Sequence, residues 1–429
     1  METTYYQGNR NLNKSGIEHE YTEYQIKEII KCKNDPIYFI RNYIHIINLD
    51  EGLVLFKLYD YQEKIVNTIH NEKRIIGKLP RQTGKALDIE TDILTIDGFQ
   101  KLKDICVGDT IFGKDGKPTK VTFITDTMYN HDCYRLTFSS GDTIVADAGH
   151  LWEISNRDWQ LNKHKSKYKI FTTKQILEYL NTKSSEIFIE TTQAVNFPTN
   201  KNVFDPYTFG LWLGDGNSDS ARISCHKDDY LYYKEKCFNV SNSFYADKRN
   251  ECVHFKIDDL YSYIRINHIK NNKHIPQEYF KSSIEQRKEL LRGLMDSDGY
   301  PSPTGCEFYQ KKEHLIDEFR ILLSSLGVRS QKREKFIKGK KYFTVSFSPE
   351  FEVFNIPRKR ENQIVCSHKR NKRLYISKIE KVESVPVKCL QVDNEDHMFL
   401  AGKNLIPTHN TTTVASYMTH YAIFNENKM

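Results

Sequence analysis

The residues around Lys85 constrain this chain more than any other feature of its sequence. A short buried strand is predicted at residues 74–79, and the loop Pro80-Arg-Gln-Thr-Gly84-Lys85 follows it. Residues 87–96 again have the pattern of strands, although a strand and loop of this kind normally lead into a helix. A helical pattern with hydroxyl groups at its start appears only at residues 411–424. The sequence therefore predicts that residues 86–410 interrupt a strand–loop–helix unit.

Joining Lys85 to Thr411 restores the end of a phosphate-binding loop, Gly84-Lys85-Thr411. In such loops the backbone N–H groups surround the phosphates, the lysine contacts the β- and γ-phosphates, and the hydroxyl binds Mg²⁺. In the uninterrupted reading, Ala86 follows the Gly-Lys pair and supplies no hydroxyl. We therefore expect nucleotide binding only after the two flanks are joined.

The two flanks resemble the start of the ATPase domain of a tailed-phage terminase large subunit, the DNA-packaging motor. The resemblance implies a partial α/β P-loop ATPase fragment made of residues 1–85 and 411–429, in which Gln62 recognises adenine. It also implies that ATP is bound only by the joined, full-length host protein. The similarity is carried by residues 35–43, 56–62 and 81–85, with a departure at Leu79, where the usual loop has a glycine.

The ends of the interrupting segment resemble the splicing blocks of an intein, which excises itself from its host chain. The similar blocks are residues 108–121, 141–152, 371–393 and 407–410. Their alternating strands and Gly/Asp turns are β-rich. The resemblance implies an all-β Hedgehog/intein (Hint) splicing domain formed by residues 86–195 together with residues 357–410.

Most inteins begin with a Cys or Ser nucleophile, but this one begins with Ala86. Trp152, Cys389 and Thr408 fall where class 3 inteins carry their Trp-Cys-Thr signature, and those inteins start with a residue that is not a nucleophile. The resemblance therefore implies that Cys389 is the first nucleophile. A lone cysteine is more often a small buried apolar residue, and its place in this block favours catalysis here.

The predicted first step is attack of the Cys389 thiolate on the Lys85 carbonyl, which releases the Ala86 amine. His150 is the candidate donor that protonates the departing nitrogen. Asp147 stands where the family commonly has Thr, and we assign it an orienting role.

The predicted second step occurs at the other junction. The Thr411 hydroxyl takes the acyl group, and Asn410 then cleaves its own peptide bond as a succinimide. His409 and His397 are candidate proton carriers there. Trp152 is expected to pack near Cys389, and Thr408 to hydrogen-bond to the site. The product is a Lys85–Thr411 peptide bond.

Two related segments lie between the splicing halves, ending in Asp215-Gly216 and Asp298-Gly299. The second matches the LAGLIDADG signature, whereas the first has Leu213 where the signature has an Asp. The pair resembles a single-chain LAGLIDADG homing endonuclease. It implies an α+β domain at residues 196–356 in which two closely packed helices bring Asp215 and Asp298 to a pseudo-twofold axis.

The resemblance also implies a partner and a cofactor. Asp215 and Asp298 are expected to share divalent ions, Mg²⁺ for this enzyme, and each to cleave one strand of double-stranded DNA. The homing site is expected in the terminase gene. Strands should line a DNA groove in which basic side chains meet phosphates. The candidate DNA-binding residues are Lys248, Arg329, Lys332 and Arg333, with Lys248 and Lys332 also candidates for catalytic lysines.

Composition supports an intracellular chain that meets a polyanion. The net charge is +7, and residues 329–345 and 357–373 each contain seven Lys or Arg. Nine scattered cysteines argue against a disulfide framework and against a zinc ribbon. No run of 18 or more apolar residues is present. We expect a monomer in the cytoplasm of a phage-infected cell.

Two other interpretations remain open at this stage. The first is a class 1 intein whose initial nucleophile was changed to Ala86. The second is a DNA-binding ATPase fragment with a structural β insertion and no splicing.

Overall fold

The computed structural model describes residues 20–48, 52–56, 58, 60–71, 86–162, 166–182, 185–247, 251–337, 339–365 and 368–409. The chain divides into two compact units, Met1–Pro80 with Thr412–Met429, and Arg81–Thr411. The second unit nearly coincides with the predicted insert 86–410. The predicted strand 74–79, the loop 80–85 and the helix 411–424 lie outside the described residues.

The first unit contains three helices and a hairpin among its described residues. These are α1 (Glu23–Asn34), α2 (Pro36–Tyr43), β1 (His45–Asn48), β2 (Gly52–Leu55) and α3 (Asp60–Asn71). Asp35 caps α2 through the backbone N–H groups of Ile37 and Tyr38, and Pro36 begins that helix. Gln62 lies in α3.

The second unit contains a part built almost entirely of strands, residues 86–195 and 371–409, which we call the β-rich part. It also has the helices α4 (Arg157–Leu161) and α5 (Thr173–Thr182), with short 3-10 turns at Leu102–Asp104 and Lys369–Lys372. The strands are β3 (Leu87–Asp88), β4 (Asp92–Thr95), β5 (Gly98–Lys101), β6 (Thr110–Phe112), β7 (Pro118–Ile124), β8 (Cys133–Phe138), β9 (Thr143–Asp147), β10 (Leu151–Asn156), β11 (Lys169–Thr172), β12 (Ile187–Glu190), β20 (Arg373–Val382), β21 (Val387–Lys388), β22 (Leu390–Val392), β23 (Met398–Ala401) and β24 (Ile406–His409).

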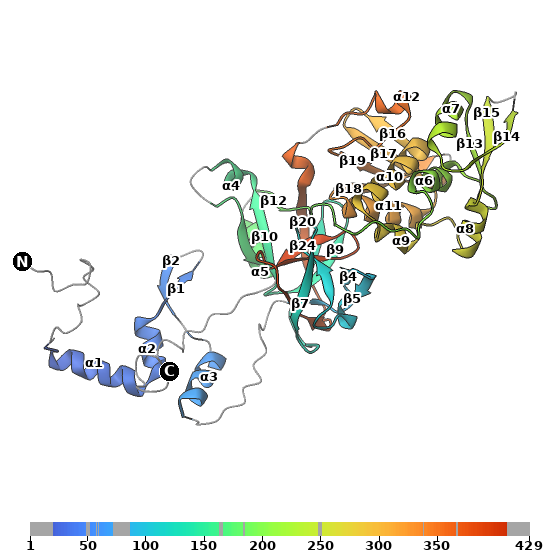
Figure 1. Cartoon of the computed structure of the whole chain (residues 1–429). Helices are drawn as coiled ribbons and strands as arrows, with labels where there is room; N and C mark the ends of the chain where they lie inside the picture. Colours follow the sequence, from blue (N-terminus) through green and yellow to red (C-terminus); the bar gives the residue numbers. More distant parts are fainter. Residues whose placement is uncertain are drawn as a thin grey trace, which may run out of the picture. The chain divides into compact units, whose positions relative to one another are not determined.

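These strands form one sheet in which the two ends of the insert interleave. The order is β21-β3-β9-β8-β20-β12-β10-β24-β23-β4-β6-β7-β22, with β11 beside β10 and β5 beside β4. β20 pairs with β8 on one side and β12 on the other, and β24 lies between β10 and β23. Figure 1 shows these C-terminal strands among the N-terminal ones. The predicted all-β architecture, assembled from both ends, is therefore observed.

Residues 196–360 form the other part of this unit, which we call the α/β part, and it consists of two similar repeats. The first repeat has α6 (Pro206–Asp215), β13 (Arg222–His226), α7 (Lys227–Lys236), β14 (Val240–Asp247), β15 (Cys252–Ile257), α8 (Leu260–Ile266) and α9 (Gln277–Phe280). The second has α10 (Ile284–Asp298), β16 (Gly299–Ser302), β17 (Gly305–Gln310), α11 (Glu313–Ser325), β18 (Ser330–Ile337), β19 (Lys340–Phe347) and α12 (Pro357–Arg360).

The two repeats have the same strand arrangement. The first sheet has the order β13-β15-β14, and the second contains β17-β19-β18 with β16 added at its edge. Gly216 bridges to Ile223 where the second repeat has the β16–β17 pair. The duplication inferred from two Asp-Gly helix ends therefore extends to the whole topology.

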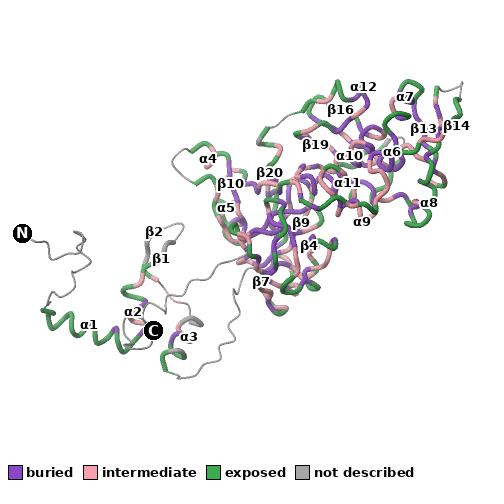
Figure 2. Tube along the Cα trace, viewed as in Figure 1, coloured by how far each residue is buried: buried purple, intermediate pink, exposed green. Residues whose placement is uncertain are grey.

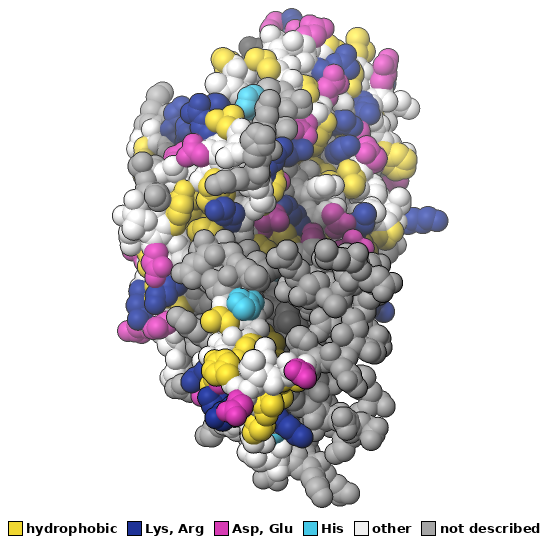
Figure 3. All heavy atoms as spheres, turned by 90° about the vertical axis from the view of Figure 1, so that its left-hand side faces the viewer, with side chains coloured by type: hydrophobic (Ala, Val, Ile, Leu, Met, Phe, Trp, Pro, Cys, Tyr) yellow, Lys and Arg dark blue, Asp and Glu magenta, His cyan; other side chains and the backbone are white. Residues whose placement is uncertain are grey.

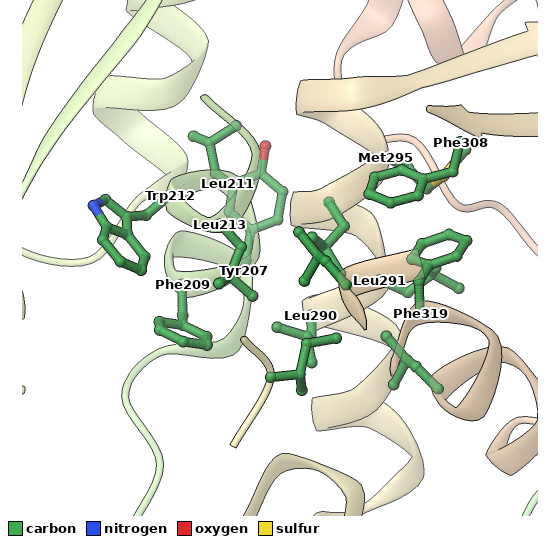
Figure 4. Packing of buried hydrophobic residues seen from close by; sticks show 14 of the residues in the cluster. Tyr207, Phe209, Leu211, Trp212, Leu213, Leu290, Leu291, Met295, Phe308 and Phe319 are labelled. Carbon is green, nitrogen blue, oxygen red and sulfur yellow. The ribbon is translucent and has the colours of Figure 1, made fainter. Parts of the chain in front are cut away.

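The helices α6 and α10 pack against each other through glycines. A Cβ on Gly210 would lie 2.4 Å from the Leu290 carbonyl oxygen, and one on Gly293 would lie 2.1 Å from the Tyr207 carbonyl oxygen. Only glycine fits at these two positions without displacing backbone. Figure 4 shows Leu211 and Leu213 of α6 and Leu290 and Leu291 of α10 in the core around this contact, and Figure 2 shows the buried residues of the unit.

The C-terminal bound of the α/β part differs from the predicted 356. Arg358 forms an ion pair with Asp229, with 2.7 Å between Nη2 and Oδ2. Lys359 donates to the last carbonyls of α10. α12 therefore packs with the repeats and not with the β-rich part, which received residues 357–372 in the prediction.

Candidate active sites

The two ends of the insert meet at one turn of the β-rich part, residues 147–150 between β9 and β10. At the first end, the Asp147 N–H donates to the Ala86 carbonyl over 3.0 Å, and Leu87 pairs with Ala146. At the other end, His409 pairs with Leu151 in β10. Ala86 is 0% exposed and His409 is 8% exposed. Two positions more than three hundred residues apart in sequence are thus held in one buried region.

Cys389 lies beside the first of these ends. The strands β21 and β3 are antiparallel with Lys388 opposite Leu87, so Cys389 falls level with Ala86. The two residues share a small buried cluster with Cys133 and Val387. The backbone of Cys389 is fixed by Thr125, which accepts from its N–H and donates to its carbonyl, each over 3.0 Å. This arrangement places the Cys389 thiol in the same buried cluster as the first residue of the insert. Lys85 itself lies outside the described residues.

His150 and Thr408 are in hydrogen-bond contact through Nε2 and Oγ1. The His150 ring also packs edge-on against Trp152, with 4.9 Å between ring centroids. Trp152 donates from Nε1 to Thr173 Oγ1 over 3.0 Å and belongs to the main core of the sheet, whereas Cys389 belongs to the cluster around Ala86. The contacts of Trp152 are thus with His150 and the sheet core, which differs from the expected packing near Cys389.

Asp147 occupies an unusual environment for a carboxylate. Its side chain is buried, and Oδ2 is 3.1 Å from His131 Nδ1. Oδ1 is buried and has no hydrogen-bond partner within the described residues. Burial raises the pKa of this carboxyl, while the hydrogen bond with His131 and the backbone amide of Ala86 lower it. Sequence reasoning did not identify His131, since a histidine in a loop carries no signal of its partner.

The second end carries two histidines. The rings of His397 and His409 have centroids 6.3 Å apart. Nδ1 of His397 is buried without a partner in the described part of the chain, and His397 adopts a positive φ of 54°. Such a strained backbone fixes the ring beside the strand that leads to Asn410. Asn410 and Thr411 lie outside the described residues.

The α/β part places Asp215 and Asp298 at the ends of α6 and α10, as predicted. A Cβ on Gly214 would lie 2.9 Å from Asp298 Oδ2, which shows how closely the two helix ends approach. Burial, and then the charge of Asp298, raise the pKa of Asp215 to about 7. Burial also raises the pKa of Asp298. A carboxyl pair that resists double ionisation in this way suits a divalent cation, because the ion favours the charged form of both groups.

Two buried lysines accompany these carboxylates and were missed in the sequence. Lys273 Nζ donates to the carbonyls of Leu213, Gly214 and Gly216, and Lys359 Nζ donates to those of Met295, Asp296 and Ser297. Each therefore caps one of the two helices. Burial lowers the pKa of each lysine to about 8, and the nearby aspartates oppose this effect. The signal that could have found them is their similar separation from Asp215 and Asp298 along the chain.

Asp296 is an acidic residue of α10 that has no acidic counterpart in α6. It is buried, and it accepts from Tyr207 Oη over 2.7 Å and from the N–H groups of Asn355 and Ile356. The equivalent position of the first helix is Leu213, which is buried in the apolar core. Asp296 thus ties α10 to the segment before α12 and is not part of the carboxylate pair.

Comparisons with known proteins give the family of one segment. The profile of the LAGLIDADG-like domain matches residues 285–380. Residues 285–380 are thus similar to this family. They include Asp298, β17 to β19 and Lys359, so the carboxylate, the sheet and one capping lysine lie within the matched region.

The chain is also similar to a curated protein over much of its length. It is 30% identical over 365 residues to the replicative DNA helicase DnaB of Mycobacterium intracellulare, which covers 79% of this chain and 61% of the helicase. The chain therefore spans less than two thirds of that protein's length.

Two solved structures are similar at low TM-scores. A DnaB1 intein splicing domain bound with zinc covers 76% of this chain and 100% of its own, with 15% identity and a TM-score of 0.26. Mesophilic variants of the homing endonuclease I-DmoI cover 37% of this chain and 94% of their own, with 13% identity and a TM-score of 0.28.

Within the matched segment, the alternation of β18 separates two predicted DNA-binding residues. Lys332 points toward α11, where its Nζ pairs with Glu313 over 2.8 Å and Asp317 over 2.7 Å. Arg333 is exposed on the opposite face of the sheet. Arg329 donates to the Arg373 carbonyl over 2.7 Å. Lys332 and Arg329 thus contact other groups of this chain. Lys248 lies outside the described residues.

The face around Arg333 is polar and hollowed. A groove there is lined by Ser302, Gln331, Arg333 and Ser346. Gln310, at the end of β17, donates to Asp298 Oδ2 over 2.6 Å and so links this sheet to the carboxylates. Figure 3 shows one face of the molecule, and on it the Lys/Arg and Asp/Glu side chains of the described residues are intermixed.

Neither a ready-made metal cluster nor a membrane span is found among the described residues. No group of three or more His, Cys, Asp or Glu there could hold a metal ion. No described helix has both the length and the apolar character needed to cross a membrane.

Proposed function

We propose that residues 86–410 are an intein that excises itself and joins Lys85 to Thr411. The observation that carries this proposal is the meeting of Ala86 and His409 at the turn 147–150. A segment that leaves a chain must bring its two ends to one active site, and a purely structural insertion has no need to bury both ends there.

The similarity to DnaB supports the proposal that residues 86–410 are an insert of a kind that can occur in different host proteins. That similarity extends over 79% of this chain, which is more than the two flanks contain, so it includes most of residues 86–410. We propose that the flanks belong to a terminase large subunit and that this intein resembles one carried by a helicase. In this proposal, ATP is bound only by the joined host protein, through Gly84, Lys85, Thr411 and Gln62.

The proposed splicing route is that of class 3 inteins, with Cys389 as first nucleophile. Ala86 has no nucleophilic side chain, and Cys389 is the thiol level with it. The Thr411 hydroxyl then receives the acyl group, Asn410 cyclises, and the N-flank becomes linked to Thr411. His397 and His409 carry protons at this second junction, while Thr408 and Trp152 hold the His150 ring.

We further propose that the α/β part is a homing endonuclease acting on double-stranded DNA. Asp215 and Asp298 would hold Mg²⁺ together with phosphate oxygens, and the ion would stabilise the attacking and leaving oxygens of each strand. Lys273 and Lys359 lie against the same helix ends and would stabilise negative charge there. Arg333 would contact DNA from the sheet, and one chain would suffice because it contains both repeats.

Splicing is tested by expressing the whole chain and measuring intact masses. We expect one species of residues 86–410 and one in which residues 1–85 are joined to 411–429. Cys389→Ala should leave the precursor uncleaved at Ala86, and ligation that survives this change would overturn the class 3 route.

The same measurement separates the two other interpretations. A class 1 intein whose first nucleophile was changed would persist as precursor and would splice after Ala86→Cys. An ATPase fragment with a structural insertion would remain intact in both forms.

The nuclease proposal is tested with a DNA duplex that carries the uninterrupted host gene across the Lys85–Thr411 codons. Cleavage of both strands in the presence of Mg²⁺ is expected. Asp298→Asn should abolish cleavage of at least one strand, and full cutting by that variant would contradict the carboxylate assignment.

A further inference from the structure

We propose that Asp147, supported by His131, donates the proton that the Ala86 nitrogen gains when the Lys85–Ala86 bond breaks. This inference rests on the proposed splicing function and assigns one of its steps. It differs from the sequence-based expectation, which gave that proton to His150 and an orienting role to Asp147.

The geometry places the Asp147 carboxyl next to the residue that leaves. The Asp147 backbone N–H holds the Ala86 carbonyl over 3.0 Å, so the side chain of Asp147 starts from a position fixed relative to Ala86. The carboxyl is buried, with Oδ2 engaged by His131 and Oδ1 without a hydrogen-bond partner in the described residues. An unengaged buried oxygen is costly unless it serves a group that the resting chain does not supply.

The electrostatic surroundings of Asp147 disfavour the ionised form of its carboxyl. Burial is the largest influence on Asp147 and raises the pKa of its carboxyl. The backbone amide of Ala86 acts on the same carboxyl and lowers the pKa, which requires the two groups to be close. That amide nitrogen is the atom that becomes the free amine of the intein.

The other titratable groups around Asp147 are few. His131 faces it from the segment before β8, and Cys133 faces it from β8 itself, where burial raises the pKa of the thiol and the charge of Asp147 adds to that effect. The turn contributes the His150 backbone N–H. Among these neighbours, His131 is the one whose side chain contacts the Asp147 carboxyl.

His150 is placed toward the other junction. Its Nε2 contacts Thr408, the residue next to His409 in β24, and its ring packs on Trp152. Asp147, in contrast, donates from its backbone N–H to the Ala86 carbonyl over 3.0 Å. The turn therefore presents different side chains to the two ends of the insert.

In the proposed first step, one bond forms and one breaks. The Cys389 sulfur forms a bond to the Lys85 carbonyl carbon, and the bond from that carbon to the Ala86 nitrogen breaks with its electron pair remaining on nitrogen. Asp147 gives its proton to that nitrogen and becomes a carboxylate. The proton lost by the Cys389 thiol enters solvent, and solvent restores the Asp147 proton through His131, whose side chain is 23% exposed.

The test isolates this step in a precursor that carries Thr411→Ala and Asn410→Ala, so that reaction stops at the thioester. Dithiothreitol then releases the N-flank, and its rate of appearance reports the first step. Asp147→Asn should slow this release by roughly 10²- to 10⁴-fold, the usual contribution of a general acid. His131→Gln should slow it by a smaller factor.

The pH profile separates catalysis from a structural role. In the parent precursor the rate should fall on the alkaline side as Asp147 loses its proton, and this alkaline limb should be absent from the residual rate of Asp147→Asn. A limb that persists in Asp147→Asn but disappears in His150→Gln would assign the proton to His150 and overturn the proposal. Release by Asp147→Asn at the parent rate would overturn it as well.

Two controls keep the outcome interpretable. Cleavage at the Asn410–Thr411 bond, measured in an Asp147→Asn precursor that retains Asn410, should continue and shows that the sheet is folded. If the parent chain never cleaves at Ala86, the splicing proposal fails; if the parent cleaves and Asp147→Asn does so equally fast, only the present inference fails.

Discussion

Some aspartate carboxyls of this protein have pKa values above their usual range. Asp215 is only partly buried, yet its pKa is raised to about 7 because burial and the charge of Asp298 act in the same direction. The ionised form of Asp215 is therefore disfavoured in the folded chain. Asp147 shows the same behaviour in the β-rich part.

The Asp215 carboxyl should make the stability of the metal-free protein dependent on pH. Its pKa is higher in the folded chain than in an unfolded one, so its stabilising contribution is complete below about pH 4 and is lost as the pH rises through about 7. Asp215→Asn should raise the free energy of unfolding at pH 8 by on the order of 1–3 kcal/mol, allowing for solvent screening. Urea titrations at pH 5 and pH 8 measure this.

Addition of Mg²⁺ provides the control for that effect. The ion should stabilise the parent chain at pH 8 and have less effect on Asp215→Asn. Identical pH dependence of the two proteins would contradict the assigned cause.

Asp296 should be important for stability rather than for cutting DNA. Asp296→Ala removes the acceptor of Tyr207 and of the Asn355 and Ile356 N–H groups and leaves them buried without it. We expect a loss of about 2–4 kcal/mol in the free energy of unfolding. Chemical denaturation measures it, and a loss below about 0.5 kcal/mol would show that these groups find other partners.

At the scale of elements, the contact between α6 and α10 depends on glycine. Gly→Ala on an exposed helix normally stabilises by about 1 kcal/mol. Gly293→Ala should have the opposite sign, because the added Cβ would lie 2.1 Å from the Tyr207 carbonyl oxygen. We expect a loss of about 2–4 kcal/mol together with reduced DNA cleavage.

The exposed position Glu285 on the same helix gives a matched control. Glu285→Ala should change stability by no more than about 0.5 kcal/mol. Thermal unfolding of the two variants, measured side by side, gives the comparison.

The sequence allowed the elements that carry their own local pattern to be predicted. The ends of α6 and α10 were predictable because an Asp-Gly pair closes each helix, and the strands of the insert because they alternate. The roles of Lys273 and Lys359 were not predictable, because each lysine acts on carbonyls of a distant helix. The partners of Lys332 were not predictable for a related reason: α11 packs against β18 and supplies two acidic side chains.

At the scale of the whole molecule, the β-rich part and the α/β part of the second unit share a buried ion pair. Arg320 of α11 is 2.8 Å from Asp142, which also accepts from Asn404 over 2.6 Å. Arg320→Ala should cost about 3–5 kcal/mol and leave the Asp142 charge uncompensated. We expect calorimetry to show two separated unfolding transitions in the variant.

Arg333→Ala is the control for this prediction, because Arg333 is exposed and lies on the sheet face away from α11. It should leave the unfolding profile unchanged and weaken DNA binding. A single transition in Arg320→Ala, at the parent temperature, would show that the two parts are coupled through other contacts.

The insertion of β20 between β8 and β12 has a consequence for timing during synthesis. A ribosome completes β8 and β12 long before it completes β20, and the strand that carries Val387 toward Ala86 comes later still. Pairing across so large a separation in sequence is slow. Ala86 and Cys389 therefore meet only when nearly the whole insert has been made. In the proposed splicing reaction, the sheet would then delay excision until the segment to be removed is complete.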